Sequence, residues 1–345
     1  MIVPMRLIAL LLGLALAIIP PGRALAQTNA RATDPGPPDA ATLSALLTQF
    51  DVPGMAVTTL EGCAVGKTLA VGKAIRDPAT PVVPETAFEA ASLAKPVFAY
   101  LVLQLVDAGR IDLDRPLAQT LSYPRITDQA AYGRITPRIV LTHRTGLPNW
   151  APDRAGPLDF DAPPGHAYTY SGEGFELLRA HVEAVTGQSL DALFRDRLGA
   201  AMPHSAFAAP LPDGARPSRG HGAGQIRDLS FRGGAAGGLI TTAPDYAAFL
   251  SLMCRGEGLS DAMLTAMLDP QSPAPQDGFP APVSWGLGWA IMAQGDDTVV
   301  THGGNNGEYR SLAGYMPATG DGLVVLTNGT NGAALIQALM AGIGG

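Results

Sequence analysis

The sequence predicts an α+β fold: an antiparallel sheet built from N- and C-terminal strands, flanked by terminal helices, with a mainly helical region inserted between them. Strand-like runs separated by turn residues occur near both ends of the chain. The long stretch between them has helical periodicity instead. Since antiparallel strands from the two ends need partners, we expect them to pair with one another in one sheet.

The N-terminal part of the expected sheet consists of a helix and two strands. Residues 41–50 carry apolar side chains at helical spacing and predict a helix that caps the sheet. Residues 54–60 and 67–74 are β-like, and the glycines between them indicate a hairpin. The C-terminal part has expected strands at 286–293, 298–301, 309–316 and 322–326 and a closing helix at 333–343.

The inserted region begins with the clearest helical pattern of the chain. Residues 97–108 are apolar nearly all round and are followed by Gly109, which is typical of a buried helix that ends at a glycine. Further helices are expected at 173–185, 189–198 and 243–253. We therefore expect a single domain over 39–345, with its sheet part at 39–91 and 283–345 and its helical insertion at about 92–282.

Composition excludes several classes of protein. The chain has 345 residues, of which 47% are hydrophobic and 15% charged, so it can bury a large core and is not disordered overall. Its formal charge is -7, and the sequence has no run of Lys and Arg. A nucleic-acid partner or a polybasic membrane-binding patch is therefore not expected.

The first 26 residues have the organisation of a secretory signal peptide. Arg6 is followed by the apolar run 7–19 and then by the small-residue site Ala24-Leu25-Ala26. A membrane anchor is the alternative, but about 13 apolar residues fall short of the roughly 20 that span a bilayer. We expect cleavage near Ala26, a secreted or periplasmic protein without a stable membrane anchor, and a disordered, Pro-rich leader at 27–38.

The two cysteines, Cys63 and Cys254, have two possible states. An exported chain permits a single disulfide between them. Two unpaired buried thiols fit the sequence equally well, because spacing alone does not show that the side chains meet. Neither cysteine has the surroundings expected of a catalytic residue.

The segment Ser92-Leu93-Ala94-Lys95 carries the clearest chemistry. It lies just before the buried helical pattern, which places Ser92 near a helix N-terminus and Lys95 one turn further on the same face. A serine hydroxyl is a poor nucleophile until a neighbouring base removes its proton. A lysine desolvated by a buried helix can be that base, because desolvation lowers its pKa.

An ordered series of motifs around this segment resembles the serine β-lactamase and penicillin-binding-protein superfamily, in particular its class C β-lactamase and esterase-like branch. The resemblance implies a β-lactamase/transpeptidase-like fold over almost the whole mature chain. It also implies that Ser92 is acylated with the help of Lys95. The matching segments are 86–96, 103–114, 141–147, 164–165, 168–172, 237–242 and 309–317.

The second motif of such proteins is Tyr-x-Asn, and here it reads Tyr170-Ser171-Gly172. The resemblance implies that Tyr170 shares protons with the lysine, protonating the leaving group and then helping water to attack. Gly172 departs from the pattern, since the family Asn helps to fix the lysine and binds the amide group of β-lactams. Introducing Asn at Gly172 is therefore expected to shift specificity toward β-lactams.

The third motif is Lys-Thr-Gly or His-x-Gly on an inner strand, and His302-Gly303-Gly304 matches the second form. Glycines there let the backbone approach a ligand closely. The resemblance implies that the N–H groups of Ser92 and Asn305 form an oxyanion hole and that His302 supports the proton network. The alternative is a glycine-rich hairpin turn with an incidental histidine.

Taken together, the motifs predict a serine hydrolase that forms an acyl-enzyme on Ser92 and hydrolyses esters or small amides or peptides. The alternatives are a β-lactamase or D,D-peptidase, and a penicillin-binding or sensing protein with negligible turnover. The expected partner is a small-molecule substrate. His143 is expected to pack or hydrogen-bond, and the histidines lack metal-ligand spacing, so neither a metal nor a cofactor is expected.

Overall fold

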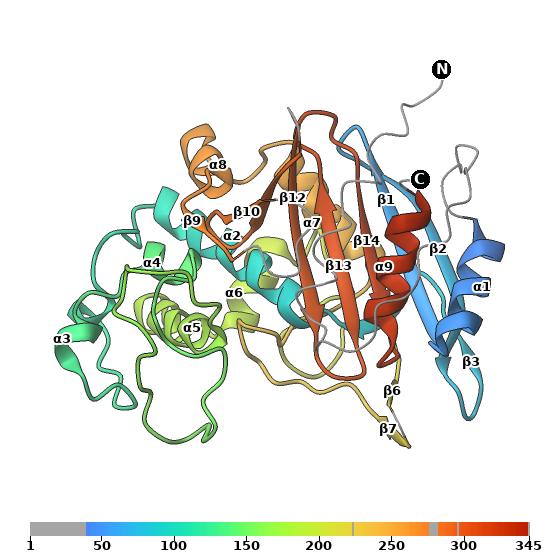
Figure 1. The fold of residues 1–345 in the computed structure, drawn as a ribbon, viewed down its shortest axis with the longest axis horizontal. Coiled ribbons are helices and arrows are strands. Elements are labelled where there is room, and N and C mark those ends of the chain that lie inside the picture. Colours follow the sequence, from blue (N-terminus) through green and yellow to red (C-terminus); the bar gives the residue numbers. More distant parts are fainter. Residues whose placement is uncertain (1–38, 223, 276–281, 295–296, 344–345) are drawn as a thin grey trace.

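The structure is a computed structural model that describes residues 39–222, 224–275, 282–294 and 297–343. The expected signal peptide and the leader lie outside the described residues. A nine-stranded antiparallel sheet runs through the described part (Figure 1). In spatial order its strands are β3 (Thr80–Pro81), β2 (Ala64–Ile75), β1 (Gly54–Glu61), β14 (Gly322–Thr327), β13 (Arg310–Tyr315), β12 (Asp297–Asn305), β11 (Ala290–Gln294), β10 (Val283–Trp285) and β9 (Ser272–Pro273).

The pairing of β1 with β14 joins the two ends of the chain. Met55 lies opposite Thr327, and Leu60 lies opposite Gly322. On its other side β1 forms the expected hairpin with β2. The predicted antiparallel sheet from N- and C-terminal strands is therefore confirmed.

Helices cover both faces of this sheet (Figure 1). The terminal helices α1 (Ala40–Phe50) and α9 (Gly332–Ile343) pack together on one face, and α2 (Ala94–Asp107) and α7 (Ala243–Cys254) lie on the other. Side chains alternate between the two faces of a strand. In β1, Met55 and Val57 accordingly join the core under the terminal helices, whereas Ala56 joins the core around α2.

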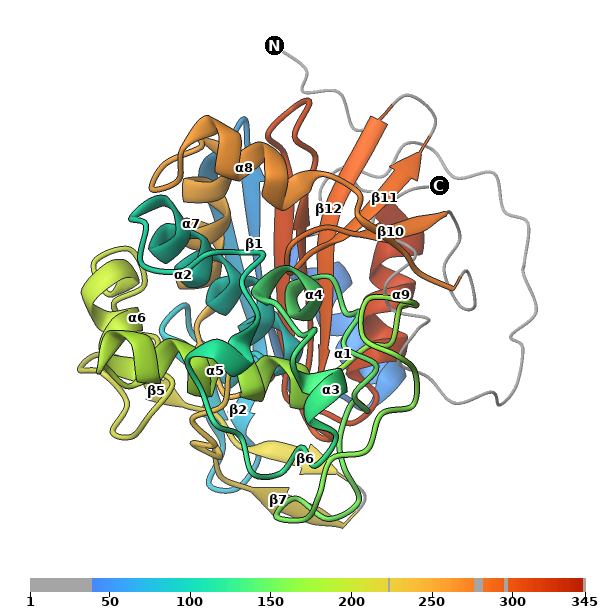
Figure 2. The ribbon, with the colours of Figure 1, turned by 90° about the vertical axis from the view of Figure 1, so that its left-hand side faces the viewer.

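The inserted region lies beside the sheet on the α2 side, as Figure 2 shows with α4 and α5 in front of the strands. Helix α2 is buried along most of its length, as its apolar pattern predicts. No helix among the described residues is long and apolar enough to cross a membrane. The other elements are β4 (Thr86–Glu89), η3 (Ala91–Leu93), η4 (Leu117–Gln119), α3 (Gln129–Tyr132), α4 (Pro137–Leu141), α5 (Gly172–Thr186), α6 (Leu190–Leu198), β5 (Arg216–Pro217), β6 (Gly220–Gly222), β7 (Gln225–Arg227), β8 (Ile240–Thr241) and α8 (Asp261–Leu268).

Two expected strands differ most from the structure. The prediction of one strand over 286–293 is wrong, because β10 ends at Trp285 and β11 begins at Ala290. Gly288 has a φ of 92°, and a Cβ there would lie 2.4 Å from the Ala99 Cβ of α2, so this turn passes too close to the helix for a side chain. In contrast, β12 is longer than the predicted 298–301 and includes the whole third motif.

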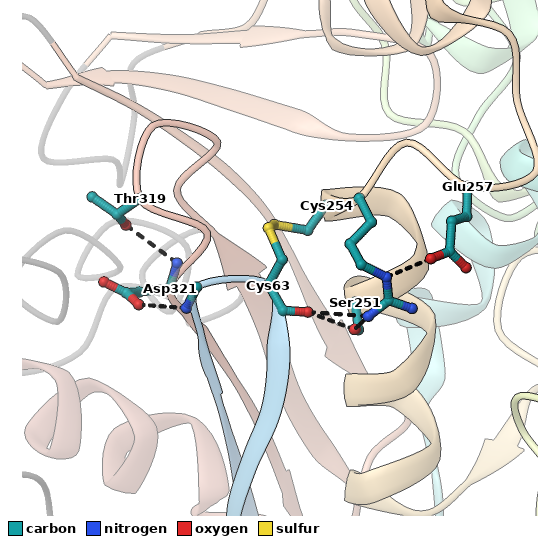
Figure 3. The surroundings of a disulfide bond; sticks show 8 residues. Cys63, Ser251, Cys254, Glu257, Thr319 and Asp321 are labelled. Carbon is teal, nitrogen blue, oxygen red and sulfur yellow. Dashed lines mark hydrogen bonds and ion pairs between the residues drawn. A yellow bond between two sulfur atoms is a disulfide. The ribbon is translucent and has the colours of Figure 1, made fainter.

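A disulfide connects Cys63, in the turn between β1 and β2, with Cys254 at the end of α7 (Figure 3). The two cysteines are separated by 191 positions in the sequence. The carbonyl of Cys63 also accepts hydrogen bonds from the Ser251 hydroxyl, at 2.5 Å, and from Arg255. The hairpin tip is therefore fastened to α7 by a covalent bond and by polar contacts.

Replacing both cysteines by alanine is expected to lower the free energy of unfolding by about 2–5 kcal/mol, because the disulfide restricts a long loop of the unfolded chain. The measurement is a urea unfolding curve under oxidising conditions, with reduced wild type as the control. Identical midpoints for oxidised wild type and the double variant would contradict the expectation.

Candidate functional site

Ser92 lies in the short 3-10 turn η3, between the end of β4 and the start of α2. The preceding Ala91 is buried and has a φ of 51°, a left-handed conformation that is strained for a residue with a side chain. Its neighbours hold it in place: Ala90 donates its N–H to the Leu239 carbonyl at 2.9 Å, and the Tyr246 hydroxyl donates to the Leu93 carbonyl at 3.0 Å. Ser92 itself is partly exposed.

Lys95 is fully buried on the first turn of α2, with its amine beside the serine. Its Nζ lies 3.2 Å from the Ser92 Oγ and 2.6 Å from the Ala236 carbonyl oxygen, to which it donates. Burial lowers the pKa of Lys95 to about 7, and the Glu176 carboxylate acts in the opposite direction. A large fraction of Lys95 is therefore unprotonated near neutral pH and able to accept the serine proton.

Tyr170 faces the same amine, with its ring centroid 4.8 Å from the Lys95 Nζ. Its ring stacks on the His143 ring at a centroid distance of 4.3 Å. His143 also accepts the backbone N–H of Ser171 at its Nδ1, at 3.0 Å. Burial raises the pKa of Tyr170 well above its ordinary value, with the Ser92 hydroxyl opposing this, so the phenol keeps its proton at neutral pH. His143 packs and hydrogen-bonds, as predicted, and its contacts position Tyr170.

His302 lies on β12 beside this pair, with its ring centroid 6.2 Å from that of Tyr170. Its Nδ1 donates to the Gly303 carbonyl at 2.7 Å. Burial and the positive charge of Lys95 lower the pKa of His302 to about 3, so the imidazole is neutral at ordinary pH. Trp285 of β10, which sequence reasoning missed, packs edge-on against both His143 and His302.

The glycines of the third motif lie within a strand and not in a hairpin turn. A Cβ at Gly304 would lie 2.1 Å from the Ser311 Oγ and 2.5 Å from the Ala90 carbonyl oxygen. Only glycine therefore lets β12 pass this close to the segment that precedes Ser92. The strand ends at Asn305, whose exposed side chain accepts the Gly307 N–H.

A partly buried ionic network lies beside the end of β12, and sequence reasoning missed it. Glu89, the residue at the end of β4, accepts a hydrogen bond from the Asn306 amide at 2.8 Å and pairs with Arg227. Arg227 also pairs with Glu308 at 2.5 Å. The Asn306 amide donates in addition to the Gly237 carbonyl at 3.1 Å. These bonds fix the chain after β12 to the strand that leads to Ser92.

Gly172 begins α5, and the loop before the helix covers it. Its N–H donates to the Asn149 backbone and side-chain oxygens, at 3.0 and 3.1 Å. A Cβ at Gly172 would lie 2.7 Å from the Asn149 backbone oxygen and 2.9 Å from the Trp150 ring. Trp150 is exposed and has the Arg154 guanidinium 3.9 Å above its ring centroid. An Asn therefore cannot simply be introduced at position 172.

The structure thus brings together Ser92, Lys95 and Tyr170, with His302 next to Tyr170 and Gly304 against the two residues before the serine. A partly exposed hydroxyl, a buried amine with a lowered pKa and a protonated phenol are the groups that acyl transfer requires. Among the described residues, no group of three or more His, Cys, Asp or Glu side chains is arranged to hold a metal ion.

Comparisons with known proteins identify the family and the fold of the chain. The family described as Beta-lactamase matches residues 40–339. Penicillin-binding protein 4 of Amycolatopsis lactamdurans is 27% identical over 321 residues, 83% of each chain, and esterase EstB of Burkholderia gladioli is 34% identical over 185 residues, 42% of this chain and 46% of the esterase. The solved D-amino acid amidase from Ochrobactrum anthropi SV3 has the same fold, with a TM-score of 0.70 at 22% identity, covering 87% of this chain and 97% of the amidase.

The reactivity of Ser92 is expected to follow the unprotonated fraction of Lys95. The rate constant for labelling Ser92 with a fluorophosphonate should rise with pH to a plateau, with a midpoint near the Lys95 pKa of about 7. Below the midpoint it should fall about tenfold per pH unit, because the ammonium form cannot accept a proton. Peptide mapping by mass spectrometry identifies the labelled serine, and a rate that is constant from mildly acidic to mildly alkaline pH would contradict the assignment.

Proposed function

The chain belongs to the beta-lactamase family, and on that premise we propose that it is a serine hydrolase that forms an acyl-enzyme on Ser92 and releases it to water. One observation carries the proposal: the Lys95 amine lies 3.2 Å from the Ser92 hydroxyl in a buried setting that lowers its pKa. A base and a nucleophile at hydrogen-bonding distance are the requirement for activating a serine.

Acylation would proceed with each proton accounted for. The unprotonated Lys95 amine takes the Ser92 proton while the Oγ forms a bond to the substrate carbonyl carbon. The resulting oxyanion lies against the N–H groups of Ser92 and Asn305. Tyr170 then gives its phenolic proton to the leaving group as that bond breaks, and the Lys95 ammonium restores the proton to Tyr170.

Deacylation would use the same groups in reverse. Tyr170 and Lys95 together accept a proton from water as its oxygen attacks the acyl carbon. The same oxyanion contacts stabilise the second tetrahedral intermediate. The Ser92 Oγ departs and regains a proton from Lys95, which returns the site to its starting state.

Esters and small amides are the substrates that the site favours over β-lactams. Position 172 offers no side-chain amide to a bound acyl group, and the Trp150 ring fills the adjacent space. A site that lacks polar groups cannot select strongly for a polar substrate. The names of two relatives, an esterase and a D-amino acid amidase, support the same classes.

A β-lactamase or D,D-peptidase is the second candidate function. A penicillin-binding protein that is acylated but has negligible turnover is a further alternative. The match to penicillin-binding protein 4 along 83% of this chain favours it. Burst kinetics separate the cases, because a stable acyl-enzyme releases one product equivalent and a hydrolase continues.

We also propose that the protein acts outside the cytoplasm. The apolar N-terminal run and small-residue cleavage site support export. The disulfide between Cys63 and Cys254 supports it independently, because such bonds persist in oxidising compartments.

Removing any of the three reacting groups is expected to lower turnover of a p-nitrophenyl ester far more than substrate binding. Ser92→Ala should abolish it, and Lys95→Ala or Tyr170→Phe should reduce kcat by about 10²–10⁴. The exposed Lys73 provides a matched control, since Lys73→Ala removes a lysine from β2 on the surface. Steady-state rates on the ester, nitrocefin and a D-Ala-D-Ala peptide test both role and substrate class. Ester turnover above a tenth of wild type in Tyr170→Phe would show that the role is misassigned.

Gly172→Asn is expected to destabilise the protein by about 1–3 kcal/mol without improving β-lactam hydrolysis, because its Cβ would collide with Asn149 and Trp150. The double variant Trp150→Ala/Gly172→Asn should recover part of the stability and raise the ratio of kcat/KM for nitrocefin to that for the ester. Urea unfolding and the two kcat/KM values are the measurements. If Gly172→Asn alone were as stable as wild type, the loop before α5 would have moved to accommodate the side chain, and the expected destabilisation would be contradicted.

A further inference from the structure

We propose that Glu176 is a positioning residue for Lys95: it holds Ala236, whose carbonyl accepts the Lys95 hydrogen bond, and its negative charge stabilises the protonated lysine. The inference rests on the proposed function, because it assumes that Lys95 is the base. Glu176 lies on α5, one turn after Gly172, and nothing in its sequence context identifies it.

The contacts run from Glu176 to the serine through one residue. The Glu176 Oε1 accepts the Ala236 N–H at 2.9 Å. The carbonyl of the same Ala236 accepts the Lys95 Nζ at 2.6 Å, and that Nζ lies 3.2 Å from the Ser92 Oγ. Moving Ala236 would therefore move the acceptor that orients the base.

The loop around Ala236 is shaped to receive the carboxylate. A Cβ at Gly234 would lie 2.5 Å from the Glu176 Oε1, so a side chain at that position would displace the acid. The Gly234 carbonyl accepts the Gly238 N–H at 2.8 Å, which closes the loop on itself. The carbonyl of Gly237, the residue after Ala236, accepts from the Asn306 amide at 3.1 Å. Glu176 and Asn306 thus each hold one residue of the loop.

Glu176 is also a charged neighbour of Lys95. The other titratable groups that face the lysine are Tyr170, His143 and His302. The phenol stays protonated and both imidazoles stay neutral, because burial raises the pKa of Tyr170 and lowers the pKa of each histidine. The Glu176 carboxylate raises the pKa of Lys95 against the larger effect of burial. Its removal is therefore expected to leave Lys95 unprotonated down to lower pH.

Arg179 partly offsets the negative charge of Glu176. It pairs with Glu176 at 2.8 Å and with Glu183 at 2.8 Å, one helical turn further along α5. The second carboxylate turns away from the site, since its Oε1 accepts the Leu190 N–H. Glu183 is therefore a matched control: it has the same charge, the same helix and the same arginine partner, but no contact with Ala236.

The test is the pH dependence of kcat/KM for a p-nitrophenyl ester. Glu176→Gln keeps an oxygen acceptor for Ala236 but removes the charge. Its acid limb is expected to shift to lower pH by about half a unit or more, with plateau kcat/KM within about threefold of wild type. Glu183→Gln is expected to shift by less than a third as much. Arg179→Gln should shift the acid limb to higher pH, because it removes the cation that offsets Glu176.

The outcomes separate this inference from the proposed function. A wild-type profile without an acid limb near the Lys95 pKa, or turnover that survives Ser92→Ala, would overturn the proposed function. A normal wild-type profile with an acid limb that neither Glu176→Gln nor Arg179→Gln moves would overturn the role of Glu176 alone. Equal shifts in Glu176→Gln and Glu183→Gln would also overturn it, since they would show a general charge effect of the helix. If Glu176→Gln does not fold, Arg179→Gln tests the role of Glu176: a shift of its acid limb to higher pH would support the role, and no shift or a shift to lower pH would overturn it.

Discussion

Lys95 lies on a helix that is buried along most of its length, where an ammonium group loses nearly all of its hydration. The surrounding structure compensates this loss only in part. The amine lies within hydrogen-bonding distance of the Ala236 carbonyl and the Ser92 hydroxyl, and the Glu176 carboxylate is linked to it by way of Ala236. Two neutral imidazoles, the Tyr170 phenol and the Phe175 ring also lie near the amine. This incomplete compensation keeps the lysine close to the balance between its two protonation states, which a base must have at neutral pH.

Glycines at three positions let the segments around the site pack closely together. Gly304 lets β12 touch the segment before Ser92, and Gly288 lets the turn between β10 and β11 lie against α2. Gly172 does the same for the loop that carries Trp150. At each position a neighbouring main-chain or side-chain atom occupies the space that a Cβ would need, so these segments pack closely against one another.

The sequence predicted the parts of this structure that depend on local pattern. Helix α2, the hairpin and the proximity of Ser92 to Lys95 all follow from spacing within a few residues. The prediction of a single strand over 286–293 failed because Gly288 turns the chain between β10 and β11. The role proposed for Glu176 could not be anticipated, because its partner Ala236 is 60 positions away and only the fold brings them together. The hydrogen bond between Glu89 and Asn306, which are 217 positions apart, was not predicted for the same reason.

The pairing of β1 with β14 has a consequence for how the protein is made. Residues 54–61 leave the ribosome long before residues 322–327, so the nascent hairpin has one unpaired edge during most of synthesis. An open strand edge is a template for association with other chains. Ser92 and the strand that carries His302 are likewise synthesised far apart. This separation gives the site a high contact order, so we expect slow assembly. A chain released before its last strand would therefore be both inactive and prone to aggregate.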